Sequence, residues 1–165
     1  MQPSLSDILS RTPPQVWIIL AVILALGLLQ LRTRNVPRSR VMILPLAMVG
    51  LSIYTLVSGF QPWGSPIGFW AAGLGIAFGV NAALIRAPSG VTHDAETDTF
   101  RVPGSIIPML VMLGIFGMNY FVGVTRALTP SRLQEPDFRM LVCGGLGLLT
   151  GLLVSRAART LRVAK

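Results

Sequence analysis

The sequence predicts an all-α membrane protein: a bundle of five transmembrane helices, a short N-terminal interfacial helix, and a small cytoplasmic β-hairpin between the third and fourth spans. Two observations predict this fold class. Apolar residues make up 52% of the 165-residue chain and charged residues only 12%, about half the charged share of a typical soluble domain. The apolar residues also gather in five long blocks without Asp, Glu, Lys, Arg or His, a pattern typical of membrane-spanning helices.

The lengths of the five blocks suit membrane spans. An α-helix rises about 1.5 Å per residue, so about 20 residues cross the hydrocarbon layer. We expect one transmembrane domain over residues 1–165, with the last span extending slightly past its apolar block. The expected spans are residues 14–31, 41–59, 67–85, 105–124 and 140–157.

The basic residues predict the orientation of these spans. The connection between the first two spans carries Arg32, Arg34, Arg38 and Arg40, whereas the next connection carries no charge. If the first connection lies in the cytoplasm, ten of the 14 basic residues fall on that side. Positive loops favour the cytoplasm, so we predict a multi-pass protein of the bacterial inner membrane with its N-terminus outside and its C-terminus cytoplasmic.

The residues before the first span predict a short helix on the membrane surface. Ser4 and Asp7 have the spacing of a capping box, in which the two side chains cap the first backbone N–H groups. Leu5 and Ile8 then share one helix face that can contact lipid. Pro13 separates this helix from the first span.

Small residues at intervals of four predict close helix packing, because they let two backbones approach. The spacing leaves open whether the contact lies within one bundle or between two copies of the chain. The residues concerned are Ala71, Gly75, Gly79 and Ala83 in the third span, and Gly147, Gly151 and Ser155 in the fifth.

The apolar blocks contain no ionisable residue for a proton relay, no histidine pair for a haem and no cluster for zinc. Cys143 stands alone in the fifth block, where we expect a small core side chain. We therefore expect no catalytic residue, no cofactor and no metal, and we predict that the protein is not an enzyme. Without a basic patch interleaved with aromatic residues, we also expect no nucleic-acid partner.

Several neutral polar residues lie within the expected spans, and the candidates for a shared polar site among them are Tyr54, Asn81, Asn119 and Tyr120. Such residues most often hydrogen-bond between neighbouring helices. The alternative is a small polar cavity, which would make the protein an oligomeric carrier or channel.

The connection between the third and fourth spans holds His93, Asp94, Glu96 and Asp98. Residues that favour strands flank this polar centre, which predicts a hairpin with its turn at 94–98. The acids alternate as in the start of a calcium loop, but the required glycine and closing glutamate are missing. We interpret this stretch first as a structural hairpin; a surface for docking a partner at its tip, a weak metal site, and an enzyme acting on lipid through His93 and Asp94 are the alternatives.

Several motifs together resemble a family of small uncharacterised bacterial inner-membrane proteins, which is distantly similar to the CcdC-type membrane proteins. The resemblance implies a multi-span helical membrane protein and transfers no catalytic residue to this chain. The motifs are Thr12-Pro-Pro-Gln-Val-Trp17, Leu44-Pro-Leu46, Phe100-Arg-Val-Pro-Gly-Ser105 and Asn119-Tyr-Phe-Val-Gly123.

These features predict a non-enzymatic accessory or interaction protein. Its expected partners are the lipid bilayer and either a second copy of the chain or another membrane protein. This expectation depends on the small residues spaced by four in the third and fifth spans, together with the lack of candidate catalytic residues.

Overall fold

A computed structural model describes residues 4–84, 91–94 and 99–162. Within these ranges the chain is mostly helical, with one small sheet. In chain order the elements are α1 (Leu5–Ser10), α2 (Pro14–Leu29), β1 (Arg34–Pro37), α3 (Arg38–Gly59), α4 (Gly64–Leu84), β2 (Thr92–Asp94), β3 (Thr99–Val102), α5 (Ile107–Leu128), the 3₁₀ helix η1 (Pro130–Gln134) and α6 (Pro136–Arg162).

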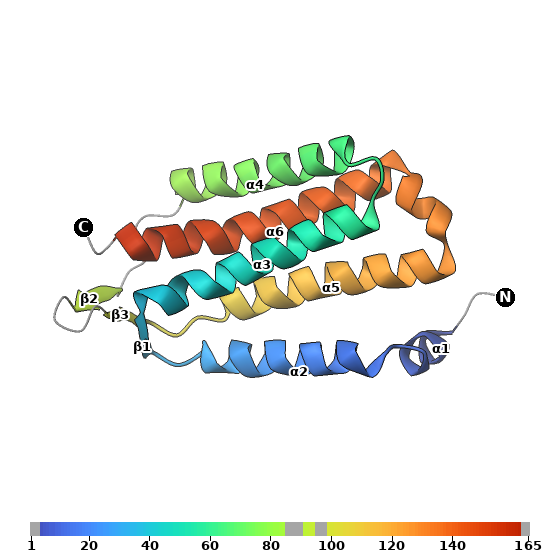
Figure 1. The fold of residues 1–165 in the computed structure, drawn as a ribbon. Helices are drawn as coiled ribbons and strands as arrows, with labels where there is room; N and C mark the ends of the chain where they lie inside the picture. The colour runs from blue at the N-terminus through green and yellow to red at the C-terminus, as the bar shows by residue number, and fades with distance from the viewer. Residues whose placement is uncertain (1–3, 85–90, 95–98, 163–165) are drawn as a thin grey trace.

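The helices α2 to α6 lie side by side and alternate in direction along the chain (Figure 1). α2 forms one edge of the bundle and packs on α5, whereas α4 forms the other edge and packs on α6. Between them α3, α5 and α6 share an apolar core, with residues such as Leu56, Ile115 and Leu146. The sheet lies at one end of the bundle, which we call the sheet end, and α1 lies at the other.

Three of the described helices are long and apolar enough to cross a membrane: Val41–Gly59 in α3, Ile107–Leu128 in α5 and Pro136–Leu161 in α6. α2 is apolar but has only 16 residues. These findings fit a membrane protein made of helices. The count of five spans stays a prediction.

The outward faces of the bundle are apolar. Ile18 of α2, Ile43 of α3 and Leu141 of α6 each expose 62% of their surface. Large apolar patches are rare on soluble monomers because they are costly to hydrate. This surface is suited to contact with lipid chains.

The expected N-terminal helix is present as α1, and it carries the predicted capping box. The Ser4 hydroxyl accepts a hydrogen bond from the Asp7 backbone at 3.3 Å, and Asp7 Oδ2 accepts one from the Ser4 backbone at 3.1 Å. Hydrogen bonding by Ser4 holds the pKa of the exposed Asp7 carboxyl below its usual value, because it stabilises the charged form.

The predicted hairpin is present: β2 pairs with β3 antiparallel, with Thr92 opposite Arg101. Asp94 ends β2, so it belongs to the strand and not to the predicted turn. The structure adds a strand that the sequence analysis did not predict. Residues of the arginine-rich connection form β1, which pairs with the other side of β3 and places the buried Val36 opposite the buried Phe100.

The connection between β3 and α5 lies directly against the connection between α2 and β1. The Ser105 N–H donates to the Gln30 carbonyl oxygen at 2.9 Å. A Cβ atom placed on Gly104 would lie 2.0 Å from the carbonyl oxygen of Leu31. Only glycine permits this approach, since the obstructing atoms belong to the backbone and cannot rotate away.

The closest helix contact joins α4 to α6 and depends on glycines. A Cβ on Gly73 would lie 2.2 Å from the Gly144 carbonyl oxygen, and one on Gly147 would lie 2.0 Å from that of Trp70. Gly151 lies in the same contact, with Ala77 opposite it. The two backbones therefore touch with no side chain between them.

Gly75 and Gly79 lie on a different face of α4. Both are exposed, and a Cβ on either would have no described atom within 4 Å. Gly75 lies two residues from Gly73, and each residue turns a helix by about 100°, so Gly73 and Ala77 face α6, whereas Gly75 and Gly79 face away from it. At Gly75 and Gly79 the predicted ladder of small residues is therefore free of close helix contacts with the described part of the chain, and its use between copies stays a prediction.

The α4–α6 contact predicts opposite outcomes for two glycines of α4. Gly73→Ala should lower the free energy of unfolding by about 1–3 kcal/mol, because the methyl group overlaps the α6 backbone. Gly68→Ala, at another α4 position with no described atom within 4 Å of its Cβ, is the matched control and should be neutral or stabilising by up to about 1 kcal/mol, since alanine favours helix. Denaturant unfolding in detergent measures both, and equal effects would contradict the assigned contact.

The close approach at Gly104 predicts that Gly104→Ala disrupts the sheet. The added methyl group should push the two connections apart and break the Ser105–Gln30 hydrogen bond. Amide hydrogen exchange in β1 and β3 should then become faster. Gly64→Ala, at a site with no described atom within 4 Å of its Cβ, should leave this exchange unchanged; unaltered exchange in Gly104→Ala would show that the connections tolerate separation.

Candidate functional site

The structure places the four predicted cavity residues in separate surroundings. Tyr54 is 69% exposed on the outside of α3. Asn119 joins α5 to α3, because its Oδ1 accepts a hydrogen bond from the Thr55 hydroxyl. The Asn119 Nδ2 donates to the carbonyl oxygen of Ile115 at 2.7 Å.

The other two residues lie in different contacts. Asn81 is 2% exposed and donates through Nδ2 to the Ser155 hydroxyl, which joins α4 to α6. The Tyr120 hydroxyl bonds the Thr12 hydroxyl at 2.9 Å and joins α5 to the segment between α1 and α2. Three of the four therefore connect neighbouring elements, each through a different hydrogen-bond partner.

The residues of the predicted docking tip are only partly described. His93 lies opposite Phe100 in the β2–β3 ladder, and Asp94 lies opposite Thr99. Glu96 and Asp98 fall outside the described residues. Within the described ranges no group of three His, Cys, Asp or Glu residues could hold a metal ion.

Arginines at the end of the bundle opposite the sheet are used to hold the chain together. The 7% exposed Arg139 donates through Nε to the Leu133 carbonyl oxygen at 2.9 Å and through Nη2 to that of Gln61 at 2.6 Å. Arg126 donates to the Ser58 carbonyl oxygen at 2.6 Å. These guanidinium groups fasten α3, η1, α5 and α6 to one another.

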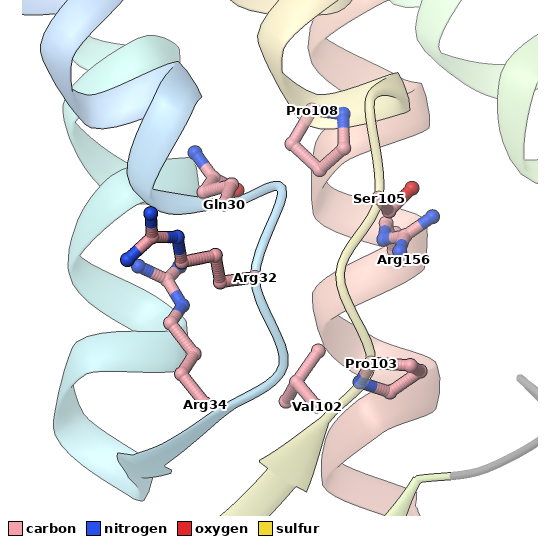
Figure 2. A pocket seen from close by; sticks show the side chains of 8 residues that line it. All are labelled: Gln30, Arg32, Arg34, Val102, Pro103, Ser105, Pro108 and Arg156. Carbon is pink, nitrogen blue, oxygen red and sulfur yellow. The ribbon is translucent and has the colours of Figure 1, made fainter.

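At the sheet end, by contrast, arginines surround a small pocket of about 50 Å³. Figure 2 shows it between the α2–β1 and β3–α5 connections, with Arg32 and Arg34 on the side of Gln30 and Arg156 beside Ser105. We call it the arginine pocket. Its described lining residues are Gln30, Arg32, Arg34, Val102, Pro103, Ser105, Pro108 and Arg156.

Segments far apart in the sequence build the arginine pocket. Arg32 follows α2, Arg34 begins β1, and Arg156 projects from the last turns of α6. The Ser105–Gln30 hydrogen bond and the close packing of Gly104 against the Leu31 carbonyl oxygen hold the two connections in place. The walls of the pocket are thus fixed by backbone contacts and do not depend on side-chain rotamers alone.

The pocket is strongly positive. An arginine side chain stays protonated under all ordinary conditions and offers five N–H donors. None of the eight described lining residues is acidic. Like charges that line one pocket repel one another, so an anion in the pocket would be favoured.

The sequence pattern alone does not indicate this site. In sequence Arg32 and Arg34 are signals of orientation, and no local pattern relates them to Arg156, more than 120 positions further along the chain. The Pro103-Gly-Ser105 motif was the available signal, because its glycine permits the close approach that forms one wall.

Comparisons with known proteins add one finding. No curated protein and no solved structure matches this chain, so the similarity to CcdC-type proteins stays a prediction. One family model matches residues 1–165, the whole length of the sequence. The chain therefore belongs to DUF6622, a family of unknown function.

Proposed function

We propose that this chain is a multi-pass protein of the bacterial inner membrane, with spans formed by α2, α3, α4, α5 and α6. The support is the side-by-side, alternating arrangement of these helices together with their apolar outer faces. α2 would span only about 24 Å, less than the roughly 30 Å hydrocarbon layer, which a bilayer can accommodate by local thinning.

In this proposal the sheet end faces the cytoplasm. Arg32, Arg34, Arg101 and Arg156 all lie at that end, as positive residues do on the cytoplasmic side. Five alternating spans then put the start of α2 outside and the end of α6 inside. The exposed Trp17 lies near the outer end of α2, where indole rings favour the headgroup layer.

We further propose that the protein acts by binding and not by catalysis, as an accessory protein of the membrane. The observation that carries this proposal is the use of its polar side chains: Asn81, Asn119 and Tyr120 bond to neighbouring elements and stabilise the bundle. What remains for interaction is the basic sheet end and the outer face of α4. A second copy of the chain is the proposed partner on α4, since exposed glycines permit close helix approach.

Orientation can be tested by labelling single cysteines in a Cys143→Ala background. Ser131→Cys in η1 and Asn35→Cys in β1 are both at exposed positions. In intact cells a membrane-impermeant maleimide should label Ser131→Cys, and it should label Asn35→Cys only after the cells are broken. The cysteine-free parent is the control, and labelling of both positions on the same side would refute the proposed orientation.

The proposed contact between copies can be tested by crosslinking in membranes. In the same background, Gly75→Cys on α4 should form disulfide-linked dimers upon mild oxidation, because the two α4 helices approach closely. Ile43→Cys, exposed on α3, is the control and should stay monomeric. Equal crosslinking at the two positions would indicate random collision and remove α4 as the interface.

A further inference from the structure

We propose that the arginine pocket binds a phosphate group, the chemistry shared by anionic phospholipid headgroups and free phosphate. Guanidinium groups are planar donors whose paired N–H groups match two oxygens of a phosphate. Arg32 and Arg156 supply such donors from opposite sides of the pocket (Figure 2). This inference rests on the proposed function only for the side of the membrane that the pocket faces.

The size and the other polar groups of the pocket suit this ligand. The volume of about 50 Å³ is several times the roughly 10–15 Å³ that one water requires, so a group of four oxygens around one phosphorus has room. The Ser105 hydroxyl accepts a bond from the Ile107 backbone at 3.3 Å, and it can still donate its hydrogen to a phosphate oxygen.

The pocket is also organised before any ligand arrives. The Ser105–Gln30 hydrogen bond, the Gly104 approach and the β1–β3 pairing fix the two connections that carry its walls. Binding to a fixed site costs less conformational entropy than binding to a site that must first become ordered.

The contrast between the two ends of the bundle supports an external anion. At the α1 end, Arg126 and Arg139 donate to carbonyl oxygens of their own chain. At the sheet end, Arg34 has a further interaction of its own within the protein, so Arg32 and Arg156 carry the proposal. Arg159 lies about one turn beyond Arg156 on α6 and adds to the positive field.

The depth of the pocket favours a lipid as the source of the phosphate. It opens just beyond the apolar ends of α2 at Leu29 and α5 at Ile107. In a bilayer this is the level of the headgroups, and basic pockets between spans on the cytoplasmic side are suited to anionic lipids. Phosphatidylglycerol therefore serves as the lipid probe.

Native mass spectrometry of the full chain in a neutral detergent tests the proposal. Phosphatidylglycerol should bind wild type with higher affinity than phosphatidylcholine does. Arg32→Gln and Arg156→Gln should each weaken phosphatidylglycerol binding about tenfold, since each removes charged hydrogen bonds. Arg101→Gln is the matched control, because Arg101 is exposed at the same end but does not line the pocket. It should bind as wild type does.

A second measurement distinguishes the two sources of phosphate. Calorimetric titration with inorganic phosphate, against chloride at equal ionic strength, should detect little binding if the lipid chains contribute to affinity. Binding of inorganic phosphate that falls in Arg156→Gln would support the same pocket with free phosphate as its ligand. Arg156→Lys keeps the charge but loses the planar pair of N–H donors. Its affinity for the phosphate probe should lie between those of wild type and Arg156→Gln.

Two outcomes would overturn the proposal. One is unchanged binding of both probes in Arg32→Gln and Arg156→Gln, provided that thermal unfolding shows the variants to be folded. The other is an equal loss in Arg101→Gln, which would indicate attraction to surface charge alone. Neither outcome alters the cysteine-labelling result, so the failure of this inference and the failure of the proposed orientation can be told apart.

Discussion

The backbone of Gly104 lies so close to the carbonyl oxygen of Leu31 that no side chain fits between them. This approach, with the adjacent Ser105–Gln30 hydrogen bond, joins the end of α2 to the start of α5. It also sets the distance at which β1 meets β3 and places Arg32 and Arg156 on opposite sides of the pocket that they line. The sheet, the α2–α5 contact and the arginine pocket therefore depend on one residue that has no side chain.

Elsewhere the bundle is held by the interactions that remain effective in lipid. In the membrane that we propose, lipid chains are as apolar as leucine, so burial from water would not drive the association of the helices. Close backbone contact through Gly73, Gly147 and Gly151 supplies dispersion energy between α4 and α6. The Asn81–Ser155 and Asn119–Thr55 hydrogen bonds then fix the rotation of each helix about its own axis.

The arginines have different roles at the two ends. Arg139 and Arg126 bond to backbone carbonyl oxygens and close the end that carries α1. Arg32 and Arg156 instead face a pocket with no acid among its described lining residues. In our proposal, the asymmetry of charge both orients the chain in a membrane and provides a ligand site at the cytoplasmic headgroup level.

Local patterns in the sequence determined the apolar helices, the Ser4–Asp7 capping box and the β2–β3 hairpin, because each depends on neighbouring residues or on alternation within one segment. Only the tertiary structure decided that part of the arginine-rich connection is a strand, since β1 is held by β3, over 60 positions away. It also decided which face of α4 meets α6, because Gly73 and Ala77 have the same spacing of four as the predicted ladder two residues away, and the sequence alone does not distinguish the two faces. The arginine pocket depends on long-range contacts and on the rotation of each helix about its own axis. Both are fixed only when the helices pack together.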